Sequence, residues 1–109
     1  MPAPCIPTDD APTVRLPLGH VVATRGALDV VRAHGIDVLA LVHRHARGDW
    51  GDLSHDDALA NDLALDPACP ARVLSAYEFP SKEGRAGRRL WVITEADRSA
   101  TTVLLPSDY

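Results

Sequence analysis

The histidines and arginines best suited to chemistry stand close together in the string His43-Arg44-His45-Ala46-Arg47. If this string is helical, residues two apart point about 200° away from each other, so His43 and His45 cannot share a metal ion. His43 and Arg47 share a face and could hold a phosphate or carboxylate, or could be a solvated face near the negative end of the helix. His45 lies on the apolar stripe, which favours a hydrogen-bonded core histidine.

A second candidate site follows in the string Asp49-Trp50-Gly51-Asp52. Trp50 between two carboxylates could form a binding corner, or it could close the core while the aspartates accept turn N–H groups. The stretch 49–66 holds six aspartates and neither Lys nor Arg, but it lacks the spacing of a calcium loop. It therefore predicts an acidic surface for a basic protein partner and no metal site. The residues assigned to this binding are Asp49, Trp50, Asp52, Asp56 and Asp62.

A third group of polar residues surrounds the last predicted turn, 96–99. Glu95, Arg98 and Thr101, with His43 reaching over from the second predicted helix, could supply acid, base and anion-stabilising groups without a metal, as in a small ribonuclease. Alternatively, Arg98 pairs with Glu95 or Asp97 and only holds the hairpin together.

A basic group precedes this turn at the other predicted hairpin loop. Its arginines could contact RNA phosphates, or they could belong to a solvated loop. The three residues are Arg85, Arg88 and Arg89.

The elements that position these residues follow from their periodicity and caps. Helices are expected from Arg25 to His34, from Asp37 to Gly48 and from Ser54 to Pro67, the last with apolar positions at Ala58, Leu59, Leu63 and Leu65. Strands are expected over 71–79, 88–95 and 100–105, with a short one at 20–23. Three helices followed by three strands predict an α+β fold. Its antiparallel sheet has three C-terminal strands and a possible N-terminal one.

The core of this sheet is expected to include one large aromatic residue. Alternation along 88–95 places Trp91 and Ile93 on one face, and we expect them to pack with Val103 and Leu105 across the hairpin.

Length and composition limit the architecture further. The 109 residues fit one domain, 18–109, behind a Pro-rich tail, 1–17, that we expect to have no regular structure. The net charge of −4 and two cysteines argue against general nucleic-acid binding and against a disulfide framework. The start of the chain has no leader pattern, and nowhere in the sequence do 18 apolar residues run together, so we expect a cytoplasmic protein without a membrane segment. Nucleotide, zinc and hydrolase motifs are missing, and no cofactor is predicted.

Several strings together resemble a family of small bacterial proteins carried on plasmids, phages and integrated elements. They include the stretch 44–52, the string Asn61-Asp62-Leu63-Ala64-Leu65 and the closing TEADRS and LLPSDY strings. Members are often labelled hypothetical, plasmid-related or, loosely, type I restriction subunit. The resemblance covers about 16–109 and implies a mobile-element setting without an established activity. The sequence contains no glycine-rich βαβ turn for a methyltransferase cofactor.

Two functional hypotheses remain. The first is a mobile-element accessory protein that binds a host or defence-system protein through its acidic surface. The second is a small metal-independent ribonuclease-like enzyme or an RNA-binding protein. The oligomeric state is not predicted.

Overall fold

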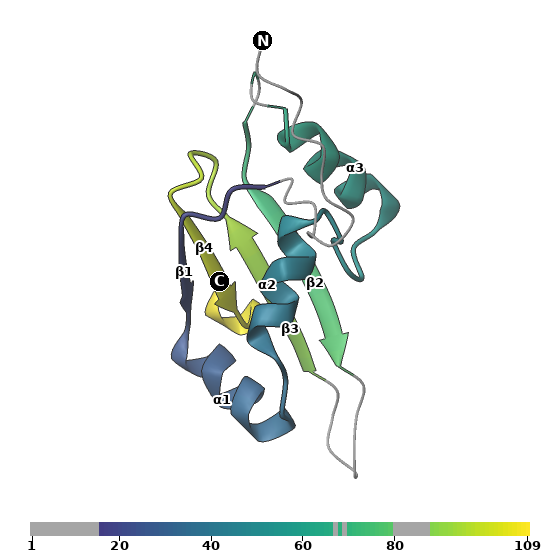
Figure 1. Ribbon diagram of the computed structural model, residues 1–109. Helices are drawn as coiled ribbons and strands as arrows, with labels where there is room; N and C mark the ends of the chain where they lie inside the picture. Colours follow the sequence, from purple (N-terminus) through teal and green to yellow (C-terminus); the bar gives the residue numbers. More distant parts are fainter. Residues whose placement is uncertain (1–15, 67, 69, 80–87) are drawn as a thin grey trace, which may run out of the picture.

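The protein is built on a four-stranded sheet with its helices on one face and at one edge (Figure 1). The computed structural model describes residues 16–66, 68, 70–79 and 88–109. The strands lie in the order β1-β4-β3-β2, with β1 parallel to β4 and the other neighbours antiparallel. Their bounds are β1 His20–Ala23, β2 Val73–Phe79, β3 Arg88–Thr94 and β4 Ala100–Leu104. The predicted α+β class is confirmed, but the sheet is mixed because β1 joins it in the parallel direction.

Within the described residues, three α-helices begin where the predicted caps stand. They are α1 Arg25–His34, α2 Val38–Ala46 and α3 His55–Ala64, and a 3₁₀ turn, η1, covers Pro106–Asp108. Thr24, Asp37 and Ser54 each accept a hydrogen bond from a backbone N–H of the first helical turn, which satisfies donors that the helix itself leaves free. Gly35 ends α1 in the left-handed conformation.

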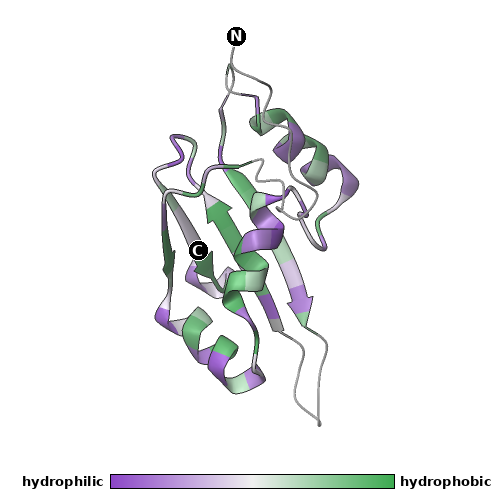
Figure 2. Cartoon of the chain, in the orientation of Figure 1, coloured by the Kyte–Doolittle hydropathy of each residue, from purple (hydrophilic) through white to green (hydrophobic). Residues whose placement is uncertain are grey.

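The main core fills the space between α1, α2 and one face of the sheet. In Figure 2 the apolar colour lies on the central strands and on helix sides turned towards them. The members of this core are Ala27, Leu41, Val42, Tyr77, Leu90, Val92 and Val103. A second cluster joins α3 to β2 and contains Leu16, Trp50, Ala64 and Val73. The two clusters together fix α3 at the β2 edge and α2 over the middle of the sheet.

The expectation that Trp91 packs with Val103 is wrong. Val103 stands opposite Val92, and Trp91 stands opposite Leu104 on the face away from α2. Trp91 is only half-buried, and its ring meets that of Tyr109 edge-on at 5.8 Å between centroids. The core face of β3 therefore carries Leu90 and Val92.

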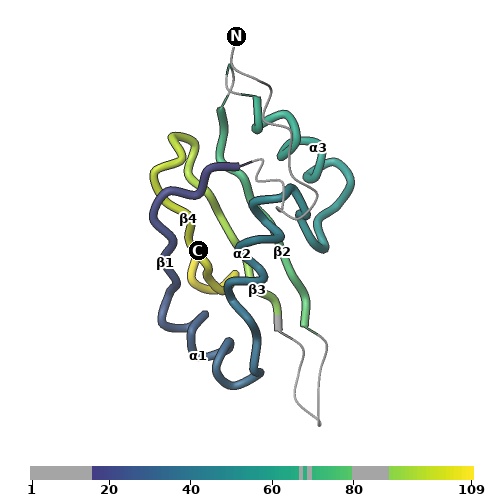
Figure 3. The backbone as a smooth tube through the Cα atoms, viewed as in Figure 1, coloured from purple at the N-terminus to yellow at the C-terminus, as the bar shows by residue number. Residues whose placement is uncertain are grey.

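The predicted tail falls almost entirely on residues 1–15, which lie outside the described residues. Leu16, inside the same predicted tail, is buried and donates its N–H to the carbonyl of Ala46 at the end of α2. Figure 3 shows this start of the described chain passing the end of α2 before it turns into β1.

Candidate functional site

The segment from Asp49 to Asp52 lies along the outer edge of β2 and closes it. Ala76 donates its N–H to the carbonyl of Trp50 (3.2 Å) and accepts from Asp52 N–H (2.7 Å), so Gly51 forms a parallel bridge with Ala76. Asp52 also accepts the N–H of Glu78 through its carboxylate, at 2.8 Å. Gly51 has φ +73°, and a Cβ there would lie 2.1 Å from the carbonyl oxygen of Ala76. Only glycine fits at this position.

Asp49 is held by an arginine on α2. Nε of Arg44 donates to its carboxylate at 2.7 Å, and the guanidinium carbon lies 4.6 Å from the centre of the Tyr77 ring. The Arg44 hydrogen bond holds the pKa of Asp49 below its usual range, and the same bond raises the pKa of Arg44. The Tyr77 hydroxyl donates to the Asp49 carbonyl at 2.6 Å, and burial raises the pKa of Tyr77 to about 12. The side chains of Arg44, Asp49 and Tyr77 are therefore engaged in contacts within the protein.

Trp50 closes the second core cluster, as one of the two alternatives predicted. Its side chain is 6% exposed and lies edge-on to the His45 ring. Its indole Nε1 donates to the carboxylate of Asp62 on α3 at 3.0 Å. Because the ring is buried, Trp50 does not itself form part of the protein surface. It acts on the surface only by holding α3 in position.

The inner side of α3 is fastened to β2 by Asn61, which sequence reasoning missed. Its side-chain amide donates to the carbonyl of Leu74 at 2.6 Å and accepts the N–H of Leu74 at 3.2 Å. Asn61 is buried and therefore continues the edge of the sheet in place of a strand. Asn61 comes three residues after Ala58 and three before Ala64, so these residues share one side of the helix. A polar residue between two small ones on that side was the sequence signal that could have revealed this contact.

The outer side of α3 combines apolar and acidic groups. Leu59 is 47% exposed and Leu63 is 74% exposed, although both are apolar positions of this helix. Exposed aspartates lie around them, at the first helical turn, beside Leu63 and just beyond the helix. We call this surface the outer face of α3. It consists of Asp56, Leu59, Asp62, Leu63 and Asp66.

The four catalytic candidates are not assembled into one site. His43 is exposed on α2, and the Glu95 carboxylate accepts from Arg72 at 3.2 Å. Thr101 is fully buried and donates to the carbonyl of Leu18 at 2.8 Å.

Arg98 is occupied by backbone carbonyls and has φ +61°. It donates to Ala64 at the end of α3 (2.6 Å), to Ala71 before β2 (2.7 Å) and to Glu95 in its own turn (3.3 Å). The cation therefore joins three segments, and its position at the C-terminal end of α3 is favourable for the helix dipole.

A buried hydrogen-bond network surrounds His45. Nδ1 lies 2.5 Å from the Ser75 hydroxyl and Nε2 lies 2.8 Å from the Thr94 hydroxyl, which in turn is 2.7 Å from the hydroxyl of Thr101. Burial, together with the charge of Arg98, lowers the pKa of His45 to about 4. The ring is fully buried, as expected for a core histidine, so this serine–histidine pair has no contact with solvent.

Of the three arginines considered for RNA, the structure describes the side chain of one. Arg89 forms an ion pair with Glu78 on the neighbouring strand. Arg88 is the first residue of β3, and Arg85 lies outside the described residues.

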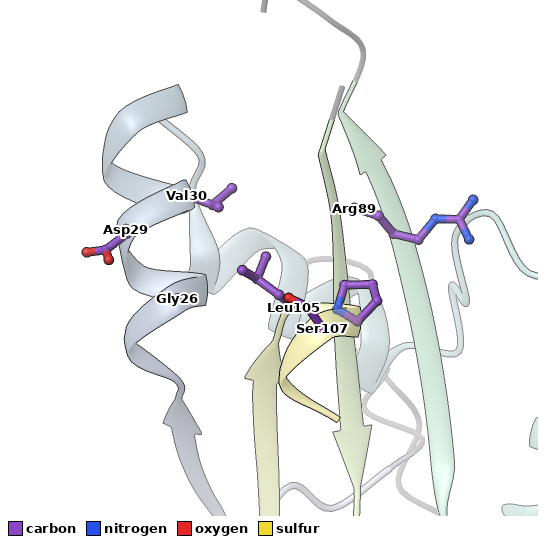
Figure 4. A pocket seen from close by; sticks show the side chains of 7 residues that line it. Gly26, Asp29, Val30, Arg89, Leu105 and Ser107 are labelled. Carbon is purple, nitrogen blue, oxygen red and sulfur yellow. The ribbon is translucent and has the colours of Figure 1, made fainter. Parts of the chain in front are cut away.

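A shallow hollow of about 500 Å³ lies between α1, η1 and β3, beside Val30, Leu105 and Pro106. In Figure 4 the charged ends of Asp29 and Arg89 point away from it. The hollow therefore offers mainly apolar contacts.

Comparisons with known proteins add no relative: no family model, curated protein or solved structure matches the chain. In the part of the chain that the structure describes, no three His, Cys, Asp or Glu side chains gather as metal ligands. The helices found there are too short and too polar to cross a bilayer.

Proposed function

We propose that this chain is a cytoplasmic accessory protein of a bacterial mobile element and that it acts by binding another protein, from the host or its defence system. The outer face of α3 is the docking surface, and its occupant is a basic, partly apolar segment of that partner. The observation that carries the proposal is the exposure of Leu59 and Leu63 one helical turn apart among carboxylates. Apolar side chains at this spacing are typical anchors for helix recognition.

The distribution of charge supports a basic partner. The stretch 49–66 holds six aspartates without Lys or Arg, whereas the rest of the chain holds eleven basic and nine acidic residues. The chain is thus strongly acidic in one segment and slightly basic elsewhere. Such a field accelerates encounter with a cationic surface and opposes encounter with nucleic acid.

The rigidity of α3 supports recognition by this helix. It is held at its inner side by Asn61, through Asp62 by the Trp50 indole, and at its end by Arg98. A helix that is already ordered loses little backbone conformational entropy when the partner docks, so only side-chain ordering remains as a cost. The residues predicted for binding therefore have different roles. Asp49 and Asp52 fix the segment beside β2, Trp50 holds α3 through Asp62, and Asp56 and Asp62 stand on the surface of α3.

The experiment measures binding of a fluorescent amphipathic peptide of leucine and lysine to the full chain by anisotropy. The double variant Leu59→Ser/Leu63→Ser should bind at least about tenfold more weakly, which corresponds to ~1.4 kcal/mol. The matched control is Leu39→Ser on α2, where the leucine is 63% exposed. If the control weakens binding as much as the double variant, or if the double variant binds like the wild type, the outer face of α3 is not the docking surface.

The acidic contribution is tested separately with Asp56→Asn/Asp66→Asn. This change leaves Asp62 in place for the Trp50 hydrogen bond and should reduce the salt dependence of binding. Asp29→Asn on α1, also exposed, removes a charge elsewhere and should leave the salt dependence close to that of the wild type. Because the control removes one charge and the double variant removes two, an effect of Asp29→Asn about half as large as that of the double variant would show that only net charge matters.

A further inference from the structure

The two edge strands of the sheet differ in whether their outer backbone groups are hydrogen-bonded. The β2 edge is covered by Gly51 and its neighbours, and the Asp52 carboxylate takes up the N–H of Glu78. At the other edge stands β1, and no described residue pairs with its outer side. In Figure 1, β1 borders the sheet opposite β2. Exposed sheet edges with free N–H and C=O groups are sites where another strand can add.

The hydrogen bonds of β1 to β4 show which groups are free. His20 donates to the carbonyl of Ser99 at 3.0 Å, and Thr24 donates to that of Val103 at 2.9 Å. In a parallel ladder alternate residues face the same neighbour, so Val21 and Ala23 direct their N–H and C=O groups outward. Next to β1, Gly19 approaches β4 so closely that a Cβ would lie 2.3 Å from the Ser99 carbonyl oxygen. The backbone just before β1 therefore lies directly against the residue that precedes β4.

We propose that a second copy of this chain adds to the β1 edge in the antiparallel direction, about a two-fold axis through Val22. In this register Val21 pairs with Ala23 of the second copy, and the reverse pair forms by symmetry. Each pair exchanges two N–H···O bonds, so all the outward groups of Val21 and Ala23 are satisfied. The side chain of Val22, now 50% exposed, meets that of the second Val22 at the axis.

Three features favour a second copy as the occupant. The free groups are self-complementary about one axis, as a two-fold interface requires. The strand His20–Ala23 carries no Asp, Glu, Lys or Arg, so self-pairing brings no formal charges together within it. The acidic helix α3 contacts β2 at the far edge, so the two acidic surfaces of a dimer lie apart. Because the strand has four residues, the interface is small and the dimer should be concentration-dependent.

The test is sedimentation of the full chain over a concentration series, with Val22→Lys and Val22→Glu as variants. The wild type should shift towards twice the monomer mass, each variant alone should remain monomeric, and an equal mixture of the two should dimerise again. Leu39→Lys and Leu39→Glu introduce the same charges at an exposed site on α2 and should dimerise like the wild type. A wild type that stays monomeric up to about 1 mM overturns the proposal, as does a mixture that fails to dimerise while both variants retain the wild-type melting temperature.

Amide exchange gives a second measurement that needs no substitution. As the wild-type concentration rises, exchange at Val21 and Ala23 should slow several-fold, because their N–H groups become bonded across the axis. The N–H of Val22 faces β4 and should change little. Equal slowing at all three residues, or no slowing at Val21 and Ala23, contradicts the proposed register.

Discussion

Lowering the pH from 7 to 5 should destabilise the protein through one buried side chain, His45. Its pKa is lowered from an ordinary value of 6.5 to about 4 by burial and by the charge of Arg98. Between these values the unfolded chain binds a proton that the folded chain does not, so stability falls as pH falls. At pH 5 the unfolded imidazole is almost fully protonated and the folded one is not. The expected loss of unfolding free energy between pH 7 and pH 5 is about 2 kcal/mol.

Urea denaturation at both pH values measures this loss, and His45→Gln provides the control. The variant should be less stable at pH 7, because the hydroxyl groups of Ser75 and Thr94 lose their hydrogen bonds to the imidazole ring. Its stability should change less than that of the wild type between pH 7 and pH 5. All other titrating groups are common to both proteins, so the difference in slope belongs to His45. In parallel, NMR titration of the His45 ring should give a pKa well below 6.5. A ring that titrates near 6.5, or a wild-type slope equal to that of the variant, would refute the reasoning.

Three further changes test the contacts that position α3, each by urea denaturation. Arg98→Ala should cost about 2 kcal/mol because the carbonyls of Ala64 and Ala71 lose their side-chain donor, while that of Glu95 keeps the backbone N–H of residue 98; Arg98→Lys should restore only part of this, and a neutral result would contradict the role of Arg98 in joining these segments. Asn61→Ala should cost about 1–3 kcal/mol, since both backbone groups of Leu74 lose their partner, and an unchanged midpoint would rule this out. Gly51→Ala should destabilise the most, because its Cβ meets the Ala76 carbonyl at 2.1 Å; tolerance would mean that the edge segment is not held there.

The helices could be predicted well from the sequence because their ends depend on local chemistry. Thr24, Asp37 and Ser54 cap the N–H groups of residues two or three positions further on, and Gly35 takes a conformation that few other residues adopt. The parallel pairing of β1 with β4 depends on contacts between residues about 80 positions apart. Local patterns contain no information on such pairing.

The face of β3 could not be chosen by alternation alone. Alternation separates Trp91 from Val92 but does not say which of them faces the helices. In the fold Thr94 lies on the core face, where its hydroxyl is 2.8 Å from Nε2 of the buried His45. Because side chains alternate along a strand, Val92 lies on the same face as Thr94, and Trp91 lies on the other face.

The candidate site was only partly accessible to sequence reasoning. The acidic stretch was identified from composition, but the sequence left open whether Trp50 forms a binding corner or closes the core. The exposure of Leu59 and Leu63 follows from the tertiary role of Asn61, which turns the opposite side of α3 to the sheet. A helix that docks through an amide and small residues leaves its leucines outside, and no periodicity rule anticipates that choice.

Photo-crosslinking in living bacteria tests the central proposal, docking of a protein on the outer face of α3, most directly. A benzophenone side chain is introduced by Leu63→benzoylphenylalanine in one strain and by Leu39→benzoylphenylalanine in another, because both leucines are exposed. The proposal predicts a discrete protein adduct with position 63 that is absent with position 39 and is weaker when Asp56→Asn/Asp66→Asn is added. An identical pattern from both positions, no adduct at position 63, or an adduct there that consists of RNA would contradict it.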